Sequence, residues 1–176
     1  MTSRDVSFHR RSIRLKGYDY SSPGAYFVTI VTRGHKCIFG KIIGSEMNLS
    51  QLGWVAHECW AGLPDHFPHV EVEPFVVMPN HIHAIVIIYE NSCRGTIYRA
   101  PTTEAFGKPV SGSLPTMIRT FKAAVSRRAN LELGWKNIWH RNYYEHILRN
   151  PSEMDTIASY ILSNPGHWLA DPENNP

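Results

Sequence analysis

The segment formed by residues 81–89 constrains the fold more than any other part of the chain. Its sequence, HIHAIVIIY, is rich in β-branched residues and fits a strand, in which alternate side chains lie on opposite faces. His81 and His83 begin one face and Ile85 and Ile87 continue it, while Ile82 belongs to the wholly apolar opposite face. Because both faces are apolar beyond the start, we predict a strand that is covered on both sides, with the histidines at its rim.

The rest of the periodicity predicts an α+β domain. Further strands are expected at residues 26–32 and 70–78, a strand or hairpin at 37–49, and helices at 50–63, 113–130 and 152–163. An aromatic-rich segment, 135–148, connects the last two helices. Strands and helices that mix without strict alternation favour an antiparallel sheet. We predict a ferredoxin-like antiparallel sheet with helices on one face and the C-terminal helix on the other.

The length of 176 residues suits one domain with short extensions. We expect a basic N-terminal arm at 1–22, a domain at 23–168 with a flexible loop insertion at 91–112, and a tail at 169–176. The chain lacks both the ~20 apolar residues of a membrane helix and the apolar core of a secretory signal. A cytoplasmic protein without membrane contact is therefore expected.

Positive charge gathers in residues 1–16 and 113–149, whereas residues 37–90 are acidic. Such clustering suits a protein that binds nucleic-acid phosphates, although a solvated helix face and a basic arm fit the charge equally well. Aromatic and basic residues also alternate in 139–147, where they either stack unpaired bases or, for Trp139 and one of two tyrosines, fill the core. The candidate DNA contacts are Arg10, Arg11, Arg14, Arg119, Lys122, Arg127, Arg128, Arg141 and Tyr143.

His81 and His83 are the first candidates for a metal site. Residues two apart on a strand share a face, so both imidazoles can reach one divalent ion. The competing interpretation is a pair of partly buried histidines that bond to backbone carbonyls. Two ligands leave a metal site incomplete, so a third must come from elsewhere in the chain.

The final helix offers that third group. Ser152 is expected as its N-cap, and its apolar stripe is expected to run through Met154, Ile157, Ala158, Ile161 and Leu162. Tyr160 and Asn164 then share a face that does not point to the core. Asn164 offers an amide oxygen as a tentative metal ligand, whereas a tyrosine in so short a helix is also a common packing residue.

Four motifs carry a family resemblance: FVVMPNHIH (75–83), TMIRTFK (116–122), IWHRNYYEHI (138–147) and IASYILSNP (157–165). In this order they resemble the single-tyrosine HUH transposases of bacterial insertion sequences, in particular the REP-associated tyrosine transposase branch, over residues 20–168. The resemblance implies that His81 and His83 bind the metal and that Tyr160 is the nucleophile. Asn164 falls where insertion-sequence relatives carry the glutamine that completes the metal site.

The resemblance also implies an enzymatic function. We expect a transposase, an enzyme of DNA recombination that nicks single-stranded, hairpin-forming DNA and transfers the strand through a 5′-phosphotyrosine at Tyr160. The expected cofactor is Mg²⁺ or Mn²⁺. Two alternatives remain open: a catalytically inactive DNA-binding module of the same fold, and a phosphodiesterase that uses a metal-bound water. Both a monomer and a homodimer that exchanges its final helix fit the resemblance.

Overall fold

The computed structural model describes residues 15, 17–90 and 110–174. The predicted arm cations Arg10, Arg11 and Arg14, and most of the predicted loop insertion, lie outside these residues. Of the predicted arm, Tyr20 is buried in the core of the domain. Within the described residues, no helix is both long and apolar enough to span a lipid bilayer.

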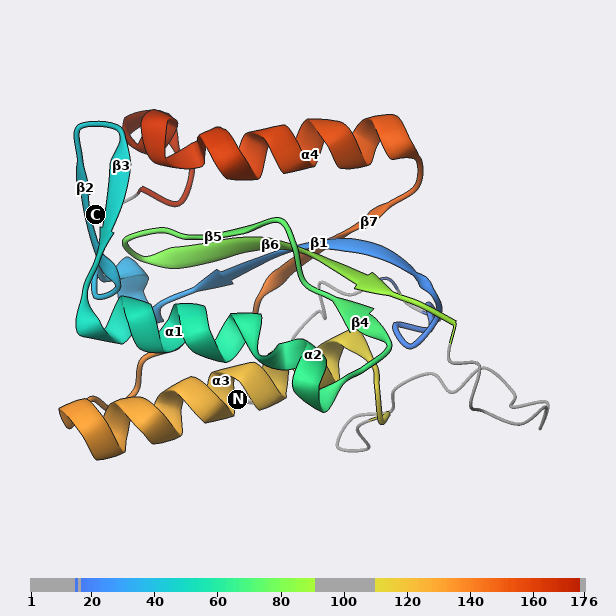
Figure 1. The fold of residues 1–176 in the computed structure, drawn as a ribbon, viewed down its shortest axis with the longest axis horizontal. Helices are drawn as coiled ribbons and strands as arrows, with labels where there is room; N and C mark the ends of the chain where they lie inside the picture. The colour runs from blue at the N-terminus through green and yellow to red at the C-terminus, as the bar shows by residue number, and fades with distance from the viewer. Residues whose placement is uncertain (1–14, 16, 91–109, 175–176) are drawn as a thin grey trace, which may run out of the picture.

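One antiparallel sheet forms the centre of the structure (Figure 1). Its strands are β1 (Gly24–Val31), β4 (Val70–Glu71), β5 (Phe75–Val77), β6 (His81–Ile88) and β7 (Tyr144–Leu148). They follow the order β4–β6–β1–β7, and β5 also pairs with β6. The predicted histidine strand, β6, therefore has neighbours on both edges.

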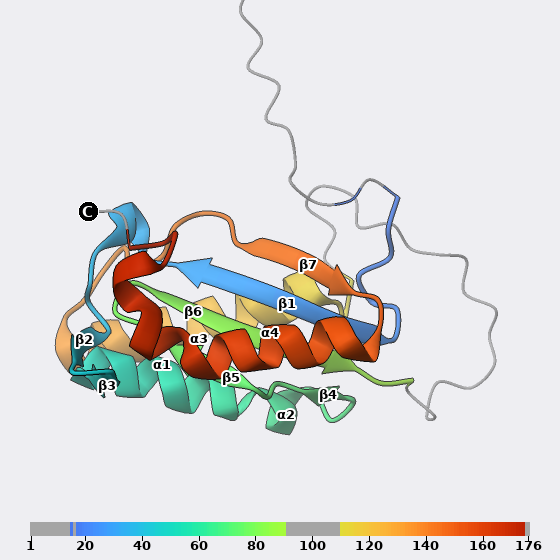
Figure 2. The same ribbon diagram turned by 90° about the horizontal axis from the view of Figure 1, so that it is seen from above.

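Helices cover the two faces of this sheet (Figures 1 and 2). α1 (Gln51–Ala61) and α3 (Leu114–Leu133) pack on one face over the main core, which contains Ile82, Val86 and the other inward residues of β6. α4 (Pro151–Ser163) packs on the other face over a smaller cluster of Phe27, Ile85, Leu148 and Ile161. The predicted fold class, an antiparallel sheet with helices on one face and the C-terminal helix on the other, is confirmed.

The remaining elements are short and connect the layers. They are η1 (Arg33–His35), the hairpin of β2 (Gly40–Ile43) and β3 (Glu46–Leu49), α2 (Leu63–His66) and η2 (Asn164–Ala170). η2 continues α4 and contacts β3. The C-terminal segment is thereby held against the end of the sheet at which β6 begins.

Strand β7 was not predicted from the sequence. It lies within the aromatic-rich segment and pairs antiparallel with β1, so that Tyr144 lies opposite Thr29. No other strand of the described chain pairs with its outer edge. A five-residue edge strand with charged and half-buried residues lacks the apolar alternation by which strands are recognised, which explains why it was missed.

The start and the orientation of α4 also differ from the prediction. The helix is capped by Asn150, whose side chain accepts a hydrogen bond from the backbone N–H of Glu153, and not by Ser152. Leu162 is 69% exposed, whereas Asn164 is buried. Tyr160 and Asn164 therefore face the sheet together with Ile161, because the apolar stripe is centred nearer to Tyr160 than the spacing suggested.

Candidate metal centre

The two histidines lie side by side at the start of β6, and both are buried. Their ring centroids are 4.3 Å apart. Nδ1 of His81 lies 2.7 Å from Oδ1 of Asn80, and Nδ1 of His83 lies 2.9 Å from the hydroxyl of Thr29. With the Nδ1 atoms engaged in this way, each Nε2 remains for a further partner.

The protonation of His81 follows from its neighbour. The Asn80 amide nitrogen donates to the carbonyls of His35 and Glu173, which fixes Oδ1 on the side of His81. Since Oδ1 only accepts, the proton of His81 sits on Nδ1 and leaves a lone pair on Nε2. Burial, and after it the adjacent His83, lower the pKa of His81, so its ring is neutral near pH 7.

Asp171 is the third member of the cluster. Its Oδ2 lies 3.9 Å from Nε2 of His81 and 3.8 Å from Nε2 of His83. Burial raises the pKa of the Asp171 carboxyl, but the contact with His83 and the hydrogen bond from Asn164 outweigh it, so the pKa lies below its usual range. Within the described chain, His81, His83 and Asp171 form a buried group that could hold a metal ion.

Two unpartnered atoms show that this cluster suits a cation. Nε2 of His81 and Oδ1 of Asn164 are both buried, and neither has a hydrogen-bond partner. Buried acceptors are rarely left unsatisfied, and here they accompany an ionised carboxylate. Neutral imidazole and carboxylate oxygen are ordinary ligands of divalent ions, so the donor set fits a metal.

Asn164 adjoins the cluster through Asp171. Its amide nitrogen donates to Oδ2 of Asp171 over 2.7 Å, while its oxygen is the unpartnered atom described above. The structure therefore gives the predicted ligand Asn164 two open roles, one that orients the carboxylate and one that supplies an oxygen. Asp171 itself was missed, because it was assigned to a tail beginning at residue 169.

The missed aspartate is held by a local turn. Oδ1 of Asp171 accepts the backbone N–H of Glu173 over 2.7 Å, the pattern by which aspartate stabilises a turn two residues on. The carbonyl of Glu173 in turn accepts from Asn80. A sequence signal for this turn exists in Asp171–Pro172, but it indicates a fixed bend and carries no sign of metal binding.

Tyr160 completes the site from α4. Its hydroxyl lies 3.2 Å from Nε2 of His83, and its ring packs on the rings of His83 and Phe27 with centroid distances of 5.3 and 6.3 Å. Burial raises the pKa of Tyr160, and the negative charge of Asp171 adds to the effect. Near neutral pH the hydroxyl therefore keeps its proton.

The predicted DNA-contacting cations of α3 lie away from this site. α3 covers the sheet face opposite to α4, as Figure 1 shows. Arg119 and Arg127 are exposed there, whereas Arg128 forms ion pairs with Glu58 and Glu132, each over 2.8 Å. The structure does not bring these side chains to the histidines.

Lys122 is engaged within the protein. Its ammonium donates to the backbone carbonyls of His140 and Asn142 over 3.0 and 2.9 Å, and burial lowers its pKa to about 8. The indole of Trp139 donates back to the carbonyl of Lys122. Lys122 thus fixes the segment that precedes β7, in which Arg141 is exposed.

The two neighbouring tyrosines of this region have different surroundings. Trp139 and Tyr143 pack against the main core, as one of the two alternatives predicted. Tyr144, in contrast, is 53% exposed and lies on the sheet face of the histidines. The sequence predicts Tyr143 as a DNA contact, but Tyr144 is the more accessible ring.

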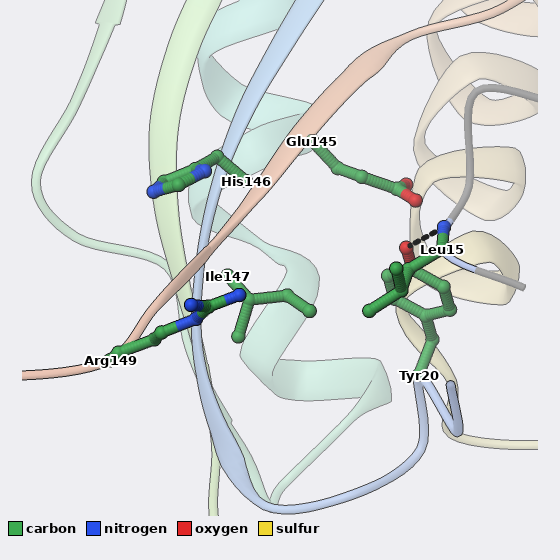
Figure 3. A pocket seen from close by; sticks show the side chains of 6 residues that line it. All are labelled: Leu15, Tyr20, Glu145, His146, Ile147 and Arg149. Atoms are coloured by element: carbon green, nitrogen blue, oxygen red, sulfur yellow. Dashed lines mark hydrogen bonds between the residues drawn. The ribbon is translucent and has the colours of Figure 1, made fainter. Parts of the chain in front are cut away.

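A separate hollow of about 200 Å³ lies beside β7 (Figure 3). The carboxylate of Glu145 points toward Leu15 and Tyr20 in this hollow, and both of its oxygens are buried without a hydrogen-bond partner. The lining shares no residue with the histidine cluster; it consists of Leu15, Tyr20, Glu145, His146, Ile147 and Arg149. We assign it no part in the metal centre.

Comparison with known proteins agrees with the fold and the motifs. No protein-family model matches the chain. An uncharacterized protein of Haemophilus influenzae is 40% identical over 166 residues, which cover 93% of this chain and 92% of the relative. A second protein of that organism, named "Putative REP-associated tyrosine transposase", is 25% identical over 147 residues, which cover 84% of this chain and 73% of the relative.

A solved structure shows the same fold. It is a REP-associated tyrosine transposase bound to a REP hairpin, with a TM-score of 0.57 and 20% identity, and the match covers 86% of this chain and 72% of that one. The chain is therefore similar in sequence to a putative REP-associated tyrosine transposase and shares the fold of a solved one.

Proposed function

We propose that this protein is a transposase that nicks single-stranded DNA and transfers the strand through a covalent 5′-phosphotyrosine at Tyr160. The observation that carries the proposal is the 3.2 Å distance between the Tyr160 hydroxyl and Nε2 of His83, beside the His81–His83–Asp171 cluster. The proposed nucleophile thus lies beside the candidate metal site, although the two are far apart in the sequence.

His81, His83 and Asp171 would hold the divalent cation, and Asn164 would either orient Asp171 or add an oxygen ligand. When bound, the cation supplies positive charge that polarises the scissile phosphate and offsets the charge of the transition state. We propose Mg²⁺ or Mn²⁺. The carboxylate, and an amide oxygen if Asn164 contributes one, are ligands that these ions accept.

Tyr160 supplies the nucleophile. Its phenol oxygen forms a new bond to phosphorus and gives up its proton, while the bond from phosphorus to the 3′-oxygen breaks and that oxygen leaves as a hydroxyl. The Tyr160 ring packs against Phe27 and His83, and these contacts support a defined orientation of its hydroxyl toward the proposed metal site. Attack on the phosphotyrosine by another 3′-hydroxyl reverses the step and joins a new strand without a nucleotide cofactor.

The proposed DNA partner is a single strand next to a hairpin. This proposal draws on the similar transposase that was solved with a REP hairpin. The assembly of nucleophile and cluster within one chain supports a monomer that acts in cis, since α4 reaches its own histidines.

One assay tests the proposal against both alternatives. Labelled single-stranded hairpin DNA is incubated with the protein and Mg²⁺ or Mn²⁺, and the products are separated under denaturing conditions. We expect an adduct that survives denaturation and is absent with Tyr160→Phe, which keeps the ring but lacks the nucleophilic oxygen. Binding of the same DNA by Tyr160→Phe serves as the control for folding.

The alternatives give different products. Cleavage without an adduct, retained in Tyr160→Phe, would identify a phosphodiesterase that uses a metal-bound water. Binding without any cleavage by the wild type would identify an inactive DNA-binding module.

A further inference from the structure

We propose that Tyr144 stacks on an unpaired base of the DNA strand beside the scissile phosphate. This inference rests on the proposed function, because it assigns part of the substrate site for the nicking reaction. Tyr144 would be a base-binding residue that positions the strand, with no part in the bond-breaking step.

The register of the sheet places Tyr144 in line with the candidate metal centre. Thr29 of β1 lies opposite His83 on one side and opposite Tyr144 on the other. Residues directly opposite one another in a sheet share a face, and neighbouring strands are about 4.8 Å apart. Tyr144 therefore lies two strands from His83 on the face that α4 and Tyr160 share.

Phe27 links the two tyrosines. Its ring centroid lies 6.3 Å from that of Tyr160 and 6.4 Å from that of Tyr144, and both pairs meet edge to face. A base that stacks on Tyr144 would therefore lie one aromatic residue away from the nucleophile. This separation suits a nucleotide that adjoins the phosphate under attack.

The exposure of Phe27 and Tyr144 supports a packing role for Phe27 and a base-binding role for Tyr144. Phe27 is 7% exposed, while Tyr144 is 53% exposed on an edge strand. Among the described strands none pairs with the outer edge of β7, so the approach to the ring from that side is not blocked by the sheet. Accessible aromatic rings are the platforms on which proteins stack the bases of single-stranded DNA.

The surrounding charge favours a nucleic acid over an apolar partner. Arg141 is exposed in the segment that leads into β7, and Arg149 is exposed directly after it. His146, on the same face as Tyr144, pairs with Glu153 over 2.6 Å, so this carboxylate is already engaged. The two arginines at the ends of β7 provide cations for the phosphates that flank a stacked base.

The test uses binding, so that it does not depend on cleavage. In the Tyr160→Phe protein, 2-aminopurine replaces in turn each single-stranded nucleotide that flanks the hairpin. We expect fluorescence quenching at one position, which is lost in Tyr144→Ala and kept in Tyr144→Phe. Loss of the ring should also weaken binding by roughly 5- to 100-fold.

Tyr89→Ala is the matched control, because Tyr89 is 50% exposed and lies just beyond the far end of β6. It should leave both fluorescence and affinity unchanged. If the wild type forms the adduct but Tyr144→Ala changes neither quenching nor affinity, base binding by Tyr144 is refuted and the proposed nicking reaction stands. Quenching that depends on Tyr144, without an adduct in the wild type, would overturn the nicking reaction and support base binding.

Discussion

The side chains of the cluster are of two kinds: the candidate metal ligands, and the residues that orient these ligands through hydrogen bonds. His81 and His83 present Nε2 because Asn80 and Thr29 engage Nδ1. Asp171 presents Oδ2 between the two imidazoles, and Asn164 donates to that same oxygen. The site therefore depends on second partners as much as on its three candidate ligands.

Substitution of Asp171 and Asn164 separates a ligand from an orienting residue. Asp171→Asn keeps the shape but removes the negative charge, so we expect the affinity for Mn²⁺ to fall by more than about tenfold. If Asn164 only orients Asp171, Asn164→Ala should lower the affinity for Mn²⁺ by roughly 10- to 100-fold. In the double variant it should then add little to the effect of Asp171→Asn. Isothermal titration calorimetry on the full chain measures both effects.

Asp155→Asn is the control, because Asp155 is an exposed carboxylate on α4. Unchanged Mn²⁺ affinity in Asp171→Asn would exclude Asp171 as a ligand. An equal loss in both single variants with additive loss in the double variant would instead indicate that Asn164 binds the ion independently.

The sequence predicted much of this site at the level of residues. The spacing of His81 and His83 was sufficient to place both on one face of a strand, and the resemblance selected Tyr160, which the structure brings to within 3.2 Å of His83. Asp171 was not predicted, because its proximity arises from the path of η2 and the turn after it. No local pattern encodes a contact between elements so distant along the chain.

At the scale of elements, α4 is held at its start by an N-cap that lies two residues before the one predicted from the sequence. Asn150 accepts the N–H of Glu153, while Ser152 is exposed within the first turn. We expect Asn150→Ala to lower the free energy of unfolding by about 1 kcal/mol, since a lost N-cap leaves a helix N–H unsatisfied. Urea denaturation measures the change.

Ser152→Ala tests the competing cap. It should change the free energy of unfolding by only a few tenths of a kcal/mol, because no cap bond is lost. A larger loss for Ser152→Ala than for Asn150→Ala would show that the helix begins where the sequence first suggested.

Strand β7 shows why elements differ in how well they are predicted. β6 has neighbours on both edges and helices on both faces, so beyond its two histidines it is apolar and is readily recognised as a strand. β7 is an edge strand of five residues, and its side chains are divided between contacts with α4, contacts with the core and exposure to solvent. Its pairing with β1 depends on tertiary contacts, which the periodicity of the local sequence does not indicate.

At the scale of the whole molecule, the sheet separates the α4 face from the α3 face. The candidate reaction site lies with α4, whereas Arg127 projects from the helix on the opposite side. Clustered charge in the sequence predicted contacts with nucleic-acid phosphates. The fold distributes that charge over two faces of the sheet, which meet at the open edge of β7.

This separation predicts the effect of Arg127→Ala on DNA binding. If the α3 face contacts phosphates of the hairpin, the variant should weaken binding to all sequences and reduce the dependence of log affinity on log salt by about one. The rate constant for adduct formation at saturating DNA should stay unchanged, because Arg127 does not reach the site. Fluorescence anisotropy over a salt series and single-turnover kinetics measure the two quantities.

Arg128→Ala provides the comparison on the same helix. Its guanidinium is already paired with Glu58 and Glu132. Arg128→Ala should therefore reduce the dependence of log affinity on log salt less than Arg127→Ala does. Unchanged affinity and salt slope in Arg127→Ala would show that DNA does not reach this face.

The two unequal cores have a consequence for the lifetime of the assembled site. Four buried side chains, Phe27, Ile85, Leu148 and Ile161, anchor α4, while the main core holds the sheet to α1 and α3. Partial opening is expected to start where the least apolar surface is covered, so we expect α4 to detach before the framework unfolds. Each detachment would carry Tyr160 away from the histidines and each return would restore it, so the candidate site would come apart while the native topology persists.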